Sequence, residues 1–287
     1  LKDGKMVGEV NPECCEEKDI HPLMVGRTLS SDTYRIHEQR EMTGKEKSVL
    51  KARDLSKQGI CKSVSVEVKE GEILGIGGLI GSGKKVLGEI LFGIKKRDKG
   101  EIIVDGHPVK KLNIQNMTKL SVGYVPAERK DFGIINLATV GENITITRLD
   151  EFSNSLGILD FKKENKLIEE GIEKFRIKAK KGDVCYSLNG GNQQKIVLTK
   201  WIMKNLDLLI LDNPTRGIDV GAKEEIYAFI REAAKNNLAI ILISDDLLEL
   251  IGLSNRIAVM KDGKVLQIVD AGKNKKPTEK ELVKDMV

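Results

Sequence analysis

Apolar residues in this chain are gathered in short runs, and the stretches between the runs show helical spacing. The runs predict strands at 63–68, 72–78, 121–126, 207–212, 239–244 and 256–261. A hairpin is expected at 101–106, a helix at 84–92, and mainly helical structure from about 140 to 204. Because strands that are covered on both faces are apolar throughout, the pattern predicts an α/β protein with a parallel sheet and inserted subdomains.

The beginning of the chain resembles a segment near its end, which suggests a tandem duplication with a period of about one domain. We therefore expect residues 1–47 to hold the tail of a preceding copy and, from residue 26 on, a polar linker. Residues 48–287 are expected to form one complete copy. The two matches are LKDGKMV (1–7) with MKDGKVL (260–266), and EKDIHPLMV (17–25) with EKELVKDMV (279–287).

Composition argues against several classes of protein. The 48 basic and 43 acidic residues are mixed along the chain, without the clustered basic stripe that is typical of nucleic-acid binders. No apolar run approaches the ~20 residues of a membrane-spanning helix, so any work at a membrane would need a partner protein. The four cysteines show no metal-ligand spacing and are expected to be reduced thiols: Cys14, Cys15, Cys61 and Cys185.

A glycine-rich segment, GLIGSGKK at 78–85, fits the pattern G-x-x-x-x-G-K and lies between a predicted strand and a predicted helix. In such a loop the backbone N–H groups and the start of the helix surround phosphate oxygens, and Lys84 would reach the β and γ phosphates. An ordinary glycine-rich turn is the alternative. Lys85 stands where a Ser or Thr hydroxyl normally binds Mg²⁺, and an ammonium group cannot bind a metal. The nucleotide-binding candidates are Gly78, Gly81, Ser82, Gly83, Lys84, Lys85, Val86 and Asp212.

An acid at the end of the strand at 207–212 is the second candidate feature. The carboxylate of Asp212 could hold a magnesium-bound water near the phosphates, although a capping role at a strand end is an alternative. The next position calls for a carboxylate that orients the attacking water, and it is Asn213. An amide cannot accept a proton at neutral pH, and loss of a general base typically reduces the rate by ~10² to 10⁴. The sequence therefore predicts slow hydrolysis.

The segment SLNGGNQQKIVLTKW at 187–201, with DNPTRGIDVGAKEEIY after it at 212–227, makes residues 48–287 resemble an ATP-binding cassette (ABC) domain. The resemblance is to the monosaccharide-importer type, in which one polypeptide carries two cassettes. It implies a P-loop NTPase core with a parallel sheet, an antiparallel β subdomain and an inserted helical subdomain at about 135–204. It also implies that two cassettes close head to tail on two ATP molecules, with Asp219 in the loop by which they touch. The signature residues that would contact the partner's ATP are Asn189, Gly190, Gly191, Asn192 and Gln193.

Several positions depart from this family's pattern. Asn189 replaces the signature serine, and Ala127 takes the place of a glutamine in the loop at 123–134. Asp245 stands where a histidine usually senses the γ phosphate, and a carboxylate there is expected to repel phosphate. Asn213 and Asp245 are thus degenerate catalytic positions, and we expect this half to bind ATP but to hydrolyse it poorly.

The resemblance implies an ABC-type sugar transporter ATPase, as the second cassette of an importer for simple sugars. It implies ATP and Mg²⁺ as cofactors, with the metal weakly bound because of Lys85. The implied partners are the preceding cassette, transmembrane permease subunits and, indirectly, an extracytoplasmic sugar-binding protein, but no nucleic acid. The implied location is the cytoplasmic face of the membrane, as a peripheral subunit. Two alternatives stay open: a regulatory nucleotide-binding half without hydrolysis, and a soluble cassette ATPase that acts outside transport.

Overall fold

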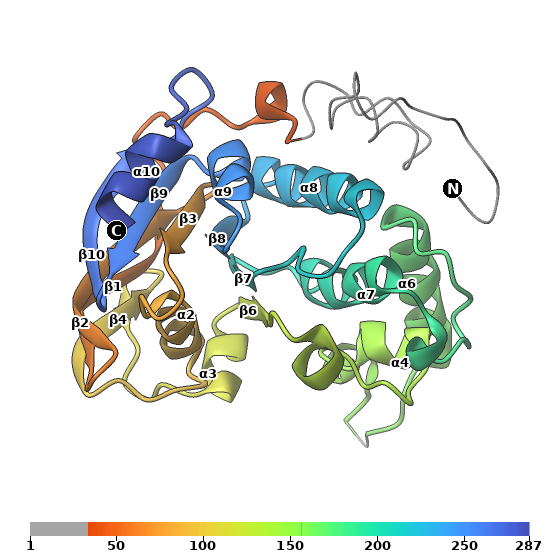
Figure 1. Ribbon diagram of the computed structural model, residues 1–287. Helices are drawn as coiled ribbons and strands as arrows, with labels where there is room; N and C mark the ends of the chain where they lie inside the picture. The colour runs from red at the N-terminus through yellow and green to blue at the C-terminus, as the bar shows by residue number, and fades with distance from the viewer. Residues whose placement is uncertain (1–33, 156, 287) are drawn as a thin grey trace, which may run out of the picture.

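The computed structural model describes residues 34–155 and 157–286 (Figure 1), and the duplicated segments at 1–7 and 17–25 lie outside them. A six-stranded sheet, in the order β10-β9-β3-β8-β7-β6, forms the centre of the molecule. Its strands pair in parallel except for the antiparallel edge pair β9 and β10. The strands are β3 (Ile73–Gly78), β6 (Val122–Val125), β7 (Leu208–Asp212), β8 (Ala239–Ile243), β9 (Arg256–Lys261) and β10 (Lys264–Asp270).

A second sheet is antiparallel and has four strands in the order β2-β1-β4-β5. These strands are β1 (Ser48–Lys57), β2 (Cys61–Lys69), β4 (Lys99–Val104) and β5 (His107–Pro108). Figure 1 shows this sheet at the opposite end of the molecule from α4, α6 and α7. The predicted α/β class, with a parallel core sheet, an antiparallel β subdomain and an inserted helical subdomain, is therefore confirmed.

Helices cover both faces of the six-stranded sheet and also build the separate helical part. In Figure 1, α2 lies on one side of the sheet, and α8 and α9 lie on the other. The contacts near two glycines agree with this arrangement. A Cβ added at Gly88 of α2 would meet Ile210 and Ile243 of the sheet, whereas one added at Gly75 of β3 would meet Leu250 of α9. The helices are α2 (Lys84–Phe92), α3 (Ile114–Lys119), α4 (Val140–Thr145), α5 (Leu149–Phe152), α6 (Phe161–Lys174), α7 (Gly190–Ile202), α8 (Val220–Lys235), α9 (Leu247–Leu253) and α10 (Glu279–Met286), with short helices η1 (Ile36–Glu38), η2 (Arg129–Gly133) and η3 (Cys185–Ser187).

Helix α7 connects the helical part to the core. Nearly all of its residues are buried, and Trp201 in its last turn packs edge-on against Phe92 of α2, with ring centroids 6.0 Å apart. Trp201 lies in an apolar helical pattern of the sequence, which predicts a core position, and its burial confirms this. A buried aromatic pair of this kind stabilises the contact beyond the area that it covers. No helix in the described ranges is both long enough and apolar enough to span a bilayer.

The part of the polar segment at 26–47 that the structure describes is held against the core. Gln39 is buried, and its Nε2 donates hydrogen bonds to the carbonyl oxygens of Ser254 (2.9 Å) and Ala271 (3.2 Å). The ring of Tyr34 packs on that of Tyr227 of α8, with centroids 5.2 Å apart. Because a buried amide and an aromatic pair both fix its course, this stretch is part of the folded domain surface from residue 34 on.

Candidate functional site

The glycine-rich loop runs from the end of β3 at Gly78 to the start of α2 at Lys84, as the sequence predicts. Gly81 and Gly83 have φ angles of 90° and 94°, a region that side chains other than glycine rarely adopt. A Cβ on Gly83 would lie 2.9 Å from the carbonyl oxygen of Ile60, so the turn also needs the space that glycine leaves. Among the described residues, the buried Ser82 Oγ has no hydrogen-bond partner. This curled loop at a helix N-terminus fits an anion such as phosphate.

The side chain of Lys84 is buried inside this turn. Its ammonium group donates to the carbonyl oxygen of Gly78 and forms an ion pair with Asp245 Oδ1 at 2.7 Å. The backbone N–H of Asp245 in turn donates to Asn213 Oδ1 at 2.8 Å. The ends of β3, β7 and β8 therefore meet here. The structure brings together four of the residues predicted from sequence: Gly78, Lys84, Asn213 and Asp245. Asp245 was expected to repel phosphate, but its observed partner is the lysine that would bind phosphate.

Asp212 is fully buried at the end of β7 and accepts two hydrogen bonds. Tyr124 Oη donates to Oδ2 at 3.1 Å, and Asn213 Nδ2 donates to Oδ1 at 3.1 Å. Burial raises the pKa of Asp212 above its usual range, and the two hydrogen bonds and the charge of Lys85 partly oppose this rise. Tyr124 was missed by sequence reasoning, because nothing in its strand indicates that its hydroxyl meets an acid 88 positions away.

The side chains present do not fit the expected magnesium site. Asp212 has both oxygens engaged by protein donors, and Lys85 supplies a cation where a ligand oxygen is needed. Lys85 Nζ lies 3.3 Å from Glu128 Oε2, and Arg216 lies 3.2 Å from the other oxygen of this carboxylate. Within the described residues, no group of three His, Cys, Asp or Glu side chains could hold a metal ion. We therefore assign no step of the chemistry to a metal.

The first signature residues lie at the start of α7. Asn189 is exposed and caps the helix, since its Oδ1 accepts from the backbone N–H of Asn192 at 3.0 Å. A Cβ on Gly190 would lie 2.4 Å from the guanidinium of Arg129, and one on Gly191 would lie 2.8 Å from Ala222 Cβ. Close packing thus explains Gly191 within this chain, whereas the end of the Arg129 side chain can move away from Gly190. The contact of both glycines with a partner's nucleotide stays a prediction.

The next two signature residues, Asn192 and Gln193, turn their side chains into this chain. Both are buried. Asn192 Oδ1 accepts from the backbone N–H of Lys178 at 2.9 Å, and Gln193 Nε2 donates to the carbonyl oxygen of Cys185 at 3.0 Å. These amides stabilise the packing of α7 in the helical part, and a contact of these two positions with a second cassette stays a prediction.

The segment after β7 is connected to the segment after β8 by a buried acid that sequence reasoning also missed. Glu249 accepts hydrogen bonds from Thr215 Oγ1 at 2.6 Å and from Ser244 Oγ. Burial raises the pKa of Glu249. At the end of the same segment, Asp219 caps α8 through a hydrogen bond from the backbone N–H of Ala222 at 2.9 Å. The predicted dimer loop is therefore anchored at both ends, and its contact across a dimer stays a prediction.

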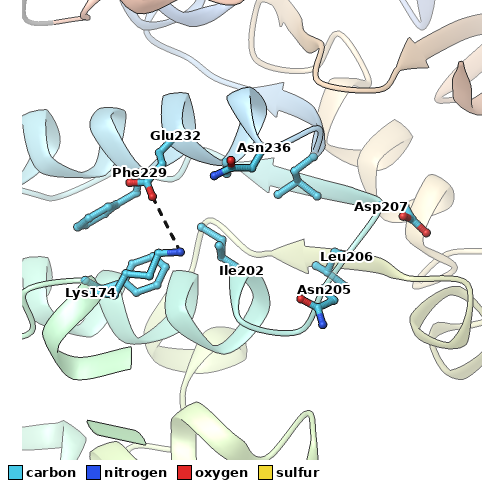
Figure 2. Close-up of a pocket in the computed structure, with 11 residues that line it drawn as sticks. Lys174, Ile202, Asn205, Leu206, Asp207, Phe229, Glu232 and Asn236 are labelled. Carbon is cyan, nitrogen blue, oxygen red and sulfur yellow. Dashed lines mark ion pairs between the residues drawn. The ribbon is translucent and has the colours of Figure 1, made fainter. Parts of the chain in front are cut away.

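A separate cleft of about 370 Å³ lies between the end of α6, the segment before β7, and α8 (Figure 2). Lys174 and Glu232 face each other across it, with Nζ and Oε1 3.9 Å apart. Asp207, just before β7, lines the cleft, whereas Asp212 ends that strand. Five residues of strand span about 17 Å. The cleft is therefore at the other end of the sheet from the phosphate-loop site.

Residues 61–216 match the model of a family described as ABC transporter. Ribose import ATP-binding protein RbsA of Clostridium perfringens is 40% identical over 268 residues, which cover 92% of this chain and 52% of that protein. The protein of the same name from Halalkalibacterium halodurans is 41% identical over 271 residues, 94% of this chain and 53% of that protein. The chain thus spans about half the length of the curated relatives it matches.

Solved structures give the same fold at lower identity. A nucleotide-free ATP-binding cassette from an ABC transporter is 19% identical, with a TM-score of 0.67, over 83% of this chain and 96% of that one. A dimeric cassette in a post-hydrolysis state, bound to ADP and Pi, is 22% identical, also with a TM-score of 0.67, over 77% of this chain and 98% of that one. At this level of identity the likeness concerns the fold alone.

Proposed function

Because this chain belongs to the ABC transporter family, we propose that it is the ATP-binding subunit of an importer for simple sugars, and that it couples ATP binding to transport. The observation that carries the proposal is the meeting of the phosphate loop with the strand ends, where Lys84 lies beside Asp245 and is connected through Asn213 to Asp212. The sugar class follows from relatives named as ribose import proteins at 40% and 41% identity.

We propose further that residues 48–287 form the second of two cassettes. The chain covers about half of each relative, and residues 1–25 resemble the end of the complete copy. On this proposal the preceding cassette is the natural partner, and the signature at Asn189–Gly191 completes the partner's site. An upstream reading frame that encodes a second phosphate loop with a Ser or Thr after its lysine is expected. A first half without such a loop would contradict this arrangement.

The site supports nucleotide binding better than hydrolysis. The amide of Asn213 donates to Asp212 and accepts from the N–H of Asp245. It occupies the position of the expected general base, but it makes hydrogen bonds to these two neighbours and cannot accept a proton from water. Lys85 replaces a metal ligand. We expect the purified 287-residue chain to show little ATPase activity, and steady turnover at several molecules of ATP per second would refute this. Lys85→Thr combined with Asn213→Glu should raise turnover when the partner cassette is present.

An apolar surface suits the proposed contact with permease subunits. Phe132, Leu137 and Tyr186 expose 78%, 85% and 76% of their surface, respectively. The two segments lie side by side, because the N–H of Tyr186 donates to the carbonyl oxygen of Asn136 at 2.9 Å. Exposed apolar patches mark interaction sites on protein surfaces. We propose that a cytoplasmic segment of a permease covers this surface, which would hold the chain at the membrane as a peripheral subunit and connect it indirectly to a sugar-binding protein.

A regulatory half that binds nucleotide without any hydrolysis is the second candidate. This candidate is favoured by Lys85, because its positive charge lowers the pKa of Asp212, as a bound metal ion would otherwise do. ATP titrations with and without Mg²⁺ separate the two. Equal affinity without the metal supports the regulatory half, whereas an absolute need for the ion supports a working ATPase.

A further inference from the structure

We propose that Asp245 makes this site hold nucleoside diphosphates in preference to nucleoside triphosphates. The inference rests on the proposed function, since it needs the phosphate loop to bind a nucleotide. Its basis is the ion pair between Asp245 Oδ1 and Lys84 Nζ at 2.7 Å. The lysine of a phosphate loop binds the β and γ phosphates of the nucleotide. In this chain a tethered carboxylate already occupies one side of that lysine.

Counting the donors of Lys84 shows the consequence for a ligand. An ammonium group has three N–H donors. One goes to the carbonyl oxygen of Gly78 and one to Asp245, which leaves one within the described residues. One donor suits one oxygen of a β phosphate, so a diphosphate can bind with the ion pair intact. A γ phosphate would have to displace Asp245 or lie beside its negative charge.

The backbone holds Asp245 in this place. Its N–H donates to Asn213 Oδ1 at 2.8 Å, and Asn213 is tied in turn to Asp212. The next acid, Asp246, is directed elsewhere, because its Oδ1 caps α9 by accepting from the N–H of Glu249 at 3.1 Å, and its Oδ2 lies 3.6 Å from Lys223 Nζ. Two adjacent carboxylates thus differ in one respect that matters here: only Asp245 contacts Lys84.

The charge of Asp245 is large enough to decide between the two nucleotides. Two like unit charges in contact repel each other even in water, and several times more strongly near a protein surface. The side chain of Asp245 is half exposed, which weakens the repulsion through solvent screening. We therefore expect an effect of about tenfold to a hundredfold on the affinity for a triphosphate.

Isothermal titration calorimetry of the 287-residue chain with ADP and with the non-hydrolysable triphosphate AMP-PNP, each with and without Mg²⁺, tests the proposal. The unmodified chain should bind ADP at least about tenfold more tightly than AMP-PNP. Asp245→Asn removes the negative charge and nearly keeps the shape of the side chain. Asp245→Ala is a second, independent variant that removes the charge together with the carboxylate group. Both should tighten AMP-PNP binding by at least about tenfold and leave ADP binding within about threefold. Asp246→Asn keeps the cap of α9 and removes an equal charge, so it should leave the ratio of the two affinities unchanged.

The outcomes distinguish this inference from the function on which it rests. Equal affinity of the unmodified chain for ADP and AMP-PNP would overturn it, as would an unchanged ratio in both Asp245 variants. A change of the same size in Asp246→Asn would also overturn it, because the effect would then belong to net charge and not to the contact with Lys84. If no nucleotide binds to any of the four proteins, the proposed nucleotide site itself fails, and this inference with it.

Discussion

Replacing glycine by alanine at two positions of the phosphate loop separates the cost of backbone conformation from the cost of contact. Gly81 and Gly83 have nearly the same φ, 90° and 94°. A Cβ on Gly81 would meet no atom within 4 Å, whereas one on Gly83 would lie 2.9 Å from the carbonyl oxygen of Ile60. The two substitutions therefore add the same atom in the same backbone region, and only one of them meets an obstacle.

The magnitudes follow from these two terms. The left-handed conformation costs an alanine about 1–2 kcal/mol, which both variants should lose from the free energy of unfolding. Overpacking adds typically ~1–3 kcal/mol, and this term falls on Gly83→Ala alone. We thus expect a loss of about 1–2 kcal/mol for Gly81→Ala and of ~2–5 kcal/mol for Gly83→Ala. Because Gly83 immediately precedes Lys84 and α2, the shift that relieves the contact should also move the phosphate-binding groups.

Urea denaturation followed by circular dichroism measures the first effect, and calorimetric titration with ADP measures the second. Gly83→Ala should bind ADP at least about tenfold more weakly than Gly81→Ala, at a temperature where both variants are folded. If Gly81→Ala proved as destabilised as Gly83→Ala and bound ADP equally weakly, the contact with Ile60 would contribute nothing, and the argument from space would be wrong.

Three further predictions concern single side chains. Trp201→Ala should lower the free energy of unfolding by about 3–5 kcal/mol in urea denaturation, because the ring is buried, whereas Tyr186→Ala, which is 76% exposed, should change it by less than ~0.5 kcal/mol. Burial lowers the pKa of Lys200 to about 8 from 10.5, so the unfolded chain binds more protons between these values and stability should rise with pH across this window. Urea midpoints that stay level there in the unmodified chain, or that still rise in Lys200→Met, would contradict this. Tyr124→Phe should cost about 1–2 kcal/mol in the same denaturation assay, because a buried acid loses one of its two donors.

The predicted strands include all four inner strands of the six-stranded sheet, β9, β3, β8 and β7, and also the edge strands β2 and β6. Continuous apolar runs identified β7, β8 and β9 to within a residue, because both faces of these strands are covered. Two strands were missed for physical reasons. β1 pairs with register shifts on both sides, which interrupt its alternation, and β10 is an edge strand whose residues are mostly exposed. Neither position gives a periodic apolar signal.

The sequence predicted those parts of the candidate site that lie in continuous motifs, but not the contacts between distant segments. The loop at 78–85 and Asp212 were found because each motif is continuous in sequence and adjoins an apolar strand. The ion pair of Lys84 with Asp245 was not found, since it joins the ends of two strands that only the sheet order brings together. The burial of Gln193 was missed because its polarity and its motif favoured a surface role, whereas its partner is a backbone carbonyl inside the helical part.

The positions at which this chain departs from its family are connected to one another. Asn213 can donate to Asp212 and accept from the N–H of Asp245 because an amide has both kinds of group. A carboxylate in its place only accepts, so Asn213→Glu alone would place a third negative charge beside Asp212 and Asp245. Asp245 in turn neutralises Lys84, and Glu128 neutralises Lys85. Asn213 thus connects Asp212 with Asp245, which is why Asn213→Glu alone is expected to destabilise the site and why the turnover test combines it with Lys85→Thr.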